Sequence, residues 1–130
     1  MSAGSGRARV LIVDDDVSVL KFLSAAFQRL GWEVRALADG AAAFDAAREQ
    51  PPDLVLLDLL MPGLDGYSVL ARMRQDEALR AVPVVLPSGE PASVHDAIGR
   101  ELGATAYLEK PLGLADLRRF LDRLSVRSGA

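Results

Sequence analysis

The stretch Val10-Leu-Ile-Val-Asp-Asp-Asp16 joins a short apolar run directly to three acids. Four consecutive apolar residues, most of them β-branched and without polar alternation, are typical of a strand that is covered on both faces. A second stretch, Leu54-Val-Leu-Leu-Asp58, has the same construction. The two stretches predict two central strands of a sheet, each with a carboxylate at its carboxyl end.

The segments around these strands alternate between helix and strand patterns. Apolar residues recur at three- and four-residue spacing from Val17 to Leu30, and Gly31 then supplies a usual helix stop. The full pattern predicts strands at 10–13, 33–37, 54–57, 82–86 and 106–108, helices at about 17–30, 39–48, 67–74, 92–102 and 114–126, and a loop at 61–66. Strands joined by helices favour a parallel sheet with helices on both faces, so we predict an α/β fold of five βα units.

Length, composition and charge limit what the chain can be. With 130 residues it fits a single domain. The formal net charge is −3, so the chain lacks the excess of basic residues that is typical of nucleic-acid-binding proteins. No apolar run is long enough to span a membrane. Because the chain has no cysteine, it can form neither disulfides nor thiolate metal sites. We expect a cytoplasmic domain at residues 9–126, with a flexible arm at 1–8, a tail at 127–130, and no direct nucleic-acid or membrane partner.

Chemically active residues follow the predicted strands. The carboxyl ends of parallel strands meet at one edge of a sheet, which brings Asp14, Asp15 and Asp58 together. Carboxylates that close need a cation or a proton to neutralise them, and Mg²⁺ prefers a few carboxylates together with phosphate oxygens. Ser88 and Lys110 follow the fourth and fifth strands and can stabilise the charge of a transferring phosphoryl group. The sequence therefore predicts a magnesium-dependent phosphate site.

Four motifs together resemble the response regulator receiver domain of two-component signalling. They are Leu11-Ile-Val-Asp-Asp-Asp16, Pro52-Asp-Leu-Val-Leu-Leu-Asp-Leu-Leu-Met-Pro-Gly-Leu-Asp-Gly66, Pro83-Val-Val-Leu-Pro-Ser-Gly89 and Tyr107-Leu-Glu-Lys-Pro111. Each motif alone is common, but the four occur in family order over almost the whole chain. The resemblance implies a flavodoxin-like doubly wound (βα)5 fold whose five-stranded parallel sheet has the strand order 2-1-3-4-5.

The resemblance also implies a role for each matching residue. Asp58 matches the aspartate that accepts a phosphoryl group from a sensor histidine kinase or a phosphotransfer protein. Asp14, Asp15, Asp58 and the backbone carbonyl of Leu60 match the ligands of Mg²⁺. The matched roles describe a signalling phosphoacceptor that assists its own phosphorylation and dephosphorylation, rather than an enzyme.

Three further matches concern the response to phosphorylation. Ser88 matches the hydroxyl residue that bonds a phosphoryl oxygen, Lys110 matches the lysine that pairs with the phosphate, and Tyr107 matches an aromatic ring that moves on activation. Ser88 and Tyr107 therefore form the implied switch, and a downstream protein target or effector domain is the implied reader.

Other interpretations of these residues fit the sequence less well than a receiver domain does. Asp16 is expected only to cap the following helix. An aspartate-nucleophile phosphatase typically has a second acid two residues after the first, and that position is Leu60 here. A nucleotide-binding domain of similar fold needs a glycine-rich loop where this chain has three acids. The remaining alternative is a degenerate receiver that binds partners without phosphorylation.

Pro87 departs from the family pattern, which usually has an apolar residue with an N–H before the hydroxyl residue. Proline removes an N–H from a predicted interior strand and fixes φ at about −65°. We therefore expect the strand to end near Leu86 and the segment from Ser88 to be stiffened. The expected consequence is a weaker coupling to Tyr107 than leucine at position 87 would permit.

Overall fold

The computed structural model describes residues 7–58, 60–61, 64–88, 106–109 and 114–127 of the chain. Its elements are β1 (Arg9–Val13), α1 (Val17–Arg29), β2 (Glu33–Leu37), η1 (Gly40–Ala42), α2 (Ala43–Glu49), β3 (Leu54–Leu57), β4 (Leu60–Met61), β5 (Leu64–Asp65), α3 (Gly66–Gln75), β6 (Val84–Ser88), β7 (Ala106–Glu109) and α5 (Leu114–Arg127). The helix expected at 92–102 lies outside the described residues. No helix of the described part is long and apolar enough to cross a membrane.

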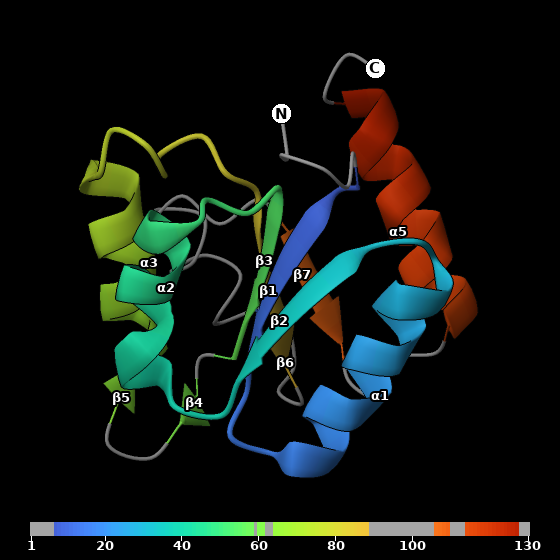
Figure 1. Ribbon diagram of the computed structural model, residues 1–130, viewed down its shortest axis with the longest axis horizontal. Helices are drawn as coiled ribbons and strands as arrows, with labels where there is room; N and C mark the ends of the chain where they lie inside the picture. Colours follow the sequence, from blue (N-terminus) through green and yellow to red (C-terminus); the bar gives the residue numbers. More distant parts are fainter. Residues whose placement is uncertain (1–6, 59, 62–63, 89–105, 110–113, 128–130) are drawn as a thin grey trace.

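The centre of the molecule is a five-stranded parallel sheet with the order β2-β1-β3-β6-β7 (Figure 1). This order is the predicted 2-1-3-4-5 arrangement, because β6 and β7 are the fourth and fifth strands of the sheet along the chain. β1 lies between β2 and β3, and its residues pair in register with both neighbours up to Val13. The expected α/β architecture is therefore confirmed for the described elements.

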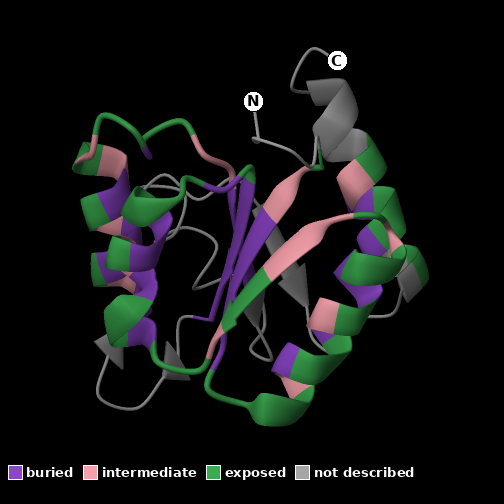
Figure 2. Ribbon diagram, in the orientation of Figure 1, coloured by how far each residue is buried: buried purple, intermediate pink, exposed green. Residues whose placement is uncertain are grey.

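Helices cover both faces of this sheet, with α2 and α3 on one side and α1 and α5 on the other (Figure 1). Side chains alternate between faces along a strand, so β1 and β3 supply residues to two separate cores. Leu11, Val13, Val55 and Leu57 belong to the core under α2 and α3, whereas their strand neighbours belong to the core under α1 and α5. Figure 2 accordingly shows the central strands as almost wholly buried, which explains their uninterrupted apolar sequences.

Helix α1 begins and ends at the residues that the sequence indicates. The Asp16 side chain accepts hydrogen bonds from the backbone N–H of Ser18 (2.9 Å) and of Val19 (3.4 Å), so it caps the helix as expected. Gly31 follows the last turn with φ +91°, a conformation that favours glycine. The inclusion of Val17 in the apolar face is wrong, because its side chain is 56% exposed.

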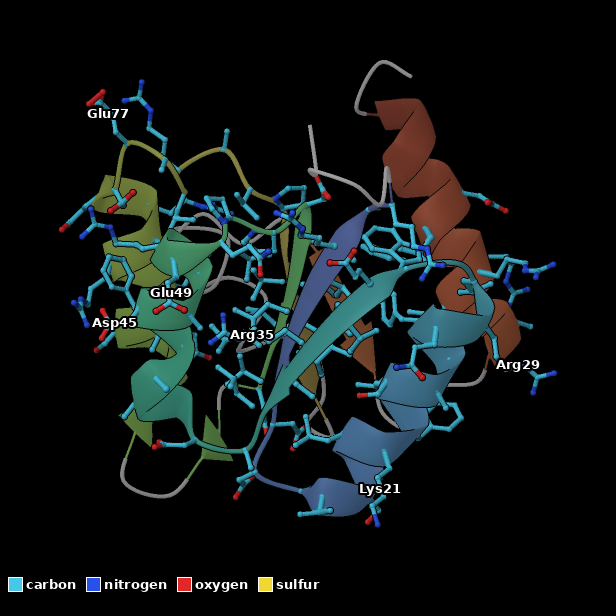
Figure 3. The ribbon with its side chains drawn as sticks, viewed as in Figure 1. Lys21, Arg29, Arg35, Asp45, Glu49 and Glu77 are labelled. Carbon is cyan, nitrogen blue, oxygen red and sulfur yellow. The ribbon has the colours of Figure 1, made fainter. Side chains whose placement is uncertain are left out.

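One exposed ion pair and the partly buried guanidinium of Arg74 link the α2–α3 layer to the sheet and to the turn before β6. Arg35 on β2 lies 3.4 Å from Glu49 on α2, and both side chains are exposed (Figure 3). Arg74 on α3 donates hydrogen bonds from Nη1 to the backbone carbonyls of Leu79 (3.3 Å), Arg80 (3.1 Å) and Val82 (2.8 Å). Desolvation by burial lowers the pKa of Arg74 below its usual value. Arg74 thereby holds the turn that leads into β6.

Two segments differ from the sequence-based expectation. Residues 61–66 were expected to be a loop, but β4 and β5 form a short antiparallel pair in which Leu60 faces Asp65. The strand expected to end near Leu86 continues through Pro87 to Ser88, so that expectation is wrong. The strand continues because its ladder with β7 extends to the pair Ser88 and Glu109.

Candidate metal centre

Three carboxylates meet at the carboxyl ends of β1 and β3. Asp14 and Asp15 follow β1, and Asp58 follows β3. The two strands end level with each other, because Val13 pairs with Leu57 and the Asp58 N–H donates to the Val13 carbonyl at 2.9 Å. One carboxylate oxygen from each aspartate lies within 4.8 Å of the other two. The predicted convergence of these three side chains is therefore present.

The three carboxylates differ in their exposure to solvent. Asp14 is 1% exposed and Asp58 is 7% exposed, and they are the only buried charged residues of the described part of the chain. Asp15 is exposed. Buried carboxylates at this separation repel each other unless a cation compensates their charge. The cluster thus has two buried carboxylates and one carboxylate that solvent can reach.

Backbone hydrogen bonds hold the Asp14 side of the cluster in place. The Asp14 N–H donates to the Leu37 carbonyl of β2 at 3.1 Å, which continues the β1–β2 ladder by one residue. An Asp14 carboxylate oxygen accepts a hydrogen bond from the Asp16 N–H at 2.9 Å. Asp16 itself turns away to cap α1 and also accepts from the Ser18 hydroxyl at 2.8 Å. The third acid of the run is therefore separate from the cluster, as the sequence predicts.

The other predicted site residues lie around this edge to different extents. Ser88 is the last residue of β6, and Tyr107 lies in β7 opposite Leu86. Leu60 begins β4, two residues after Asp58. Lys110 lies outside the described residues. The structure thus places Ser88 at the end of the strand that neighbours β3, and Leu60 shortly after Asp58, whereas Tyr107 lies on the edge strand β7, one strand farther from the carboxylates.

Sequence analysis missed one feature of α1. Val17 and Phe22 on α1 are the exposed large hydrophobic residues of the described part, at 56% and 45%. Val17 is the first residue of the helix that starts directly after the three acids. The helix period can reveal Phe22, because it lies outside the stripe formed by Leu20, Leu23 and Phe27. Two large apolar side chains of α1, one of them in its first turn, are therefore open to solvent.

The arrangement has the chemistry of a divalent cation site that handles phosphate. Hard carboxylate oxygens are the protein ligands that Mg²⁺ prefers, and Mg²⁺ commonly binds through one or two of them while keeping water and phosphate ligands. The donor set of Asp14, Asp15 and Asp58 fits this requirement in number, type and spacing. No histidine or cysteine of the described residues joins the group, so softer metals are disfavoured.

Comparison with known proteins agrees with this chemistry. A family model described as the response regulator receiver domain matches residues 10–122. The DNA-binding response regulator MtrA of Mycobacterium tuberculosis (strain ATCC 25618 / H37Rv) is 39% identical over 105 residues, which are 81% of this chain and 45% of the relative. The transcriptional regulatory protein PrrA of the same strain is 41% identical over 131 residues, which are 100% of this chain and 55% of the relative. The chain spans about half the length of these curated relatives.

Solved structures show the same fold. The chemotaxis protein CheY4 of Vibrio cholerae is 30% identical with a TM-score of 0.86, and the match covers 91% of this chain and 98% of that chain. The receiver domain of the sensor histidine kinase PA1611 from Pseudomonas aeruginosa PAO1 is 31% identical with a TM-score of 0.82, and the match covers 91% and 97%. That structure has a magnesium ion coordinated in its active site cleft. With the fold, the carboxylate cluster and the family model in agreement, the chain belongs to the response regulator receiver domain family of two-component signalling.

Proposed function

We propose that residues 9–126 form a receiver domain in which Asp58 accepts a phosphoryl group in a Mg²⁺-dependent reaction. The observation that carries this proposal is the group of three carboxylate oxygens within 4.8 Å at the ends of β1 and β3. Asp58 comes from a different strand than Asp14 and Asp15, so it can face a phosphoryl donor while the acidic pair holds the cation. A degenerate receiver has no need of all three carboxylates together, so this geometry favours the phosphoacceptor.

The cation is assigned to Asp14, Asp15, Asp58 and the backbone carbonyl of Leu60. Two buried carboxylates and one exposed carboxylate leave the solvent side open for water and phosphate oxygens. When bound, Mg²⁺ supplies positive charge that neutralises the carboxylates and the phosphoryl oxygens. The magnesium ion in the cleft of the related PA1611 receiver domain supports this assignment.

The transfer itself is a displacement at phosphorus. A carboxylate oxygen of Asp58 attacks the phosphorus of a phosphohistidine, the P–N bond breaks, and the histidine nitrogen leaves with its electron pair and takes up a proton. The product is an acyl phosphate on Asp58. Ser88 and Lys110 are assigned to the phosphoryl oxygens by hydrogen bonding and charge, the interactions on which phosphoryl transfer mainly depends.

Partners are proposed on both sides of this reaction. The phosphoryl donor is a sensor histidine kinase or a phosphotransfer protein, and the exposed side chains of Val17 and Phe22 on α1 offer it apolar contacts. The reader is a downstream protein target or an effector domain. MtrA and PrrA are a DNA-binding response regulator and a transcriptional regulatory protein, which fits an effector domain in the longer relatives. With such partners, we propose that the domain works in the cytoplasm.

The phosphoacceptor proposal is tested with acetyl phosphate and intact-protein mass spectrometry. With Mg²⁺ present, the wild-type chain should gain one labile phosphoryl group. Removal of Mg²⁺ with EDTA, or the substitution Asp15→Asn, should abolish or strongly slow the gain. The absence of an adduct in the wild type, or an undiminished adduct in Asp58→Asn, contradicts the proposal.

Output is proposed to run through the surface that includes β7 and α5, together with the segment 92–102. Ser88 and Tyr107 are the matched switch residues, and a new phosphate beside them is a local charge change that can alter a wider surface. Beryllofluoride with Mg²⁺ mimics the acyl phosphate. Outside the site, its largest amide shifts should fall between about residues 88 and 121. Shifts that instead cluster on α2 and α3 contradict this surface.

A further inference from the structure

Pro87 lies at a defined position in the hydrogen-bond ladder of β6. In a parallel sheet, successive residues of a central strand direct their N–H and C=O groups to opposite neighbours. The Val55 N–H donates to the Pro83 carbonyl at 3.0 Å, so residue 83 faces β3. Residues 85 and 87 therefore also face β3, while residues 84, 86 and 88 face β7.

The observed pairing ends where this alternation predicts. β3 pairs with β6 only at Val55 with Val84 and at Leu56 with Val85. The next pair, Leu57 with Leu86, requires an N–H from residue 87 to the Leu57 carbonyl, and proline has no N–H. The ladder between β6 and β7 needs no N–H from residue 87, and it continues to Ser88 and Glu109.

At the carboxyl edge of the sheet, Pro87 thus marks the point where pairing between β3 and β6 stops. On one side, β1 and β3 stay paired to their ends through Val13 and Leu57, and the Asp58 N–H bonds the Val13 carbonyl. On the other side, the last residues of β6 are paired with β7 alone. The acidic cluster belongs to the first side, whereas Ser88 belongs to the second.

We propose that Pro87 is a positioning residue that releases the end of β6 from β3, so that Ser88 moves together with the end of β7 relative to Asp58. This inference rests on the proposed function, because it concerns how the hydroxyl of Ser88 approaches a phosphoryl group on Asp58. Because β3 does not pair with the end of β6, Ser88 can approach Asp58 without breaking a β3–β6 hydrogen bond. Because Ser88 pairs with Glu109, a shift of Ser88 also moves Glu109.

This proposal reverses the expectation drawn from the sequence. A weaker coupling to Tyr107 was expected because the strand was expected to end near Leu86. Since the strand reaches Ser88 and stays paired with β7, the missing hydrogen bond lies on the β3 side. Pro87 is therefore expected to strengthen the link between Ser88 and β7 relative to a residue that has an N–H.

The first test is amide hydrogen exchange in Pro87→Ala, which supplies the missing donor. The register predicts that the new amide at position 87 bonds the Leu57 carbonyl and exchanges at least about tenfold more slowly than an unprotected amide. Free exchange at position 87 would show that the register argument is wrong. This measurement requires no phosphorylation and decides the structural part of the proposal by itself.

The second test compares the response to beryllofluoride and Mg²⁺ in wild type, Pro87→Ala and Pro83→Ala. A restored backbone hydrogen bond of typical strength changes a two-state population about fivefold. The changes in amide chemical shift that beryllofluoride causes at Ser88 and at Glu109 should therefore both be smaller in Pro87→Ala than in wild type. Pro83→Ala makes the same chemical change just before β6 and should leave both responses as in wild type. The amide of Asp58 should respond in all three proteins.

The outcomes distinguish this proposal from the proposed function. Equal Ser88 and Glu109 responses in wild type and Pro87→Ala overturn the role of Pro87, as does a wild-type response at Ser88 without one at Glu109. A wild-type chain in which beryllofluoride shifts no amide near Asp58 overturns the phosphoacceptor function instead. The exchange rate at position 87 then still decides whether Pro87 ends the β3–β6 ladder.

Discussion

Replacing Asp58 by asparagine should stabilise the fold when Mg²⁺ is absent. The substitution keeps the size of the side chain and removes one of three negative charges whose oxygens lie within 4.8 Å. At that separation and an effective dielectric constant of about 20, one pair of charges repels by about 3.5 kcal/mol. Solvent at the exposed Asp15 and hydrogen bonds to the carboxylates reduce this repulsion. We expect a net gain of about 1–3 kcal/mol in the free energy of unfolding, or roughly 4–12 °C in Tm.

The assay is thermal and urea unfolding of both proteins, in EDTA and in Mg²⁺. Mg²⁺ at about 100 times its Kd should add about 2.7 kcal/mol to the wild type. It should add much less to Asp58→Asn, so the two stabilities converge. Asp122→Asn on α5 is the control, because Asp122 is exposed and far from the cluster in sequence. A less stable Asp58→Asn protein in EDTA, or equal stabilisation of both proteins by Mg²⁺, refutes the reasoning.

Three further predictions concern residues around the site. Asp16→Ala should lose about 1 kcal/mol of stability in urea unfolding because the helix cap is missing, yet it should still gain a phosphoryl group from acetyl phosphate. Failure to gain that group would contradict a purely capping role for Asp16. Arg74→Met should lower the free energy of unfolding by about 2–4 kcal/mol, because Nη1 donates to three backbone carbonyls, and Arg74→Lys should recover only part of that loss. An Arg74→Met protein as stable as wild type would show that the turn before β6 does not depend on Arg74. Phe22→Ala should slow phosphotransfer from a cognate kinase but leave the acetyl phosphate rate unchanged, and equal slowing of both rates contradicts a docking role.

The sequence predicts the central strands well because their physical signal is local. β1 and β3 are covered on both faces, so their apolar runs are uninterrupted and end at acids. Gly31 and Asp16 likewise mark the ends of α1 through backbone conformation and capping. The end of β6 has no such local signal. Whether proline ends a strand depends on which neighbour its missing N–H faces, and that is known only from the register.

In the candidate site too, some features follow from the sequence pattern and others depend on tertiary packing. The convergence of Asp14, Asp15 and Asp58 follows from strand order, because parallel strands bring their carboxyl ends to one edge. The difference in exposure between Asp14 and Asp15 depends on packing that the sequence does not show. The exposure of Val17 was also missed, because a residue in the first turn of a helix can match the apolar period and still lie beyond the core.

The central claim is that Asp58 carries the phosphoryl group, and its most direct test is to locate the modified residue. Borohydride reduces an acyl phosphate on aspartate to homoserine, which tandem mass spectrometry can assign to one position. After acetyl phosphate and Mg²⁺ treatment, we predict homoserine at position 58 and none at positions 14, 15 or 16. Homoserine at any of those three positions, or at none, contradicts the assignment of Asp58 as the phosphoacceptor.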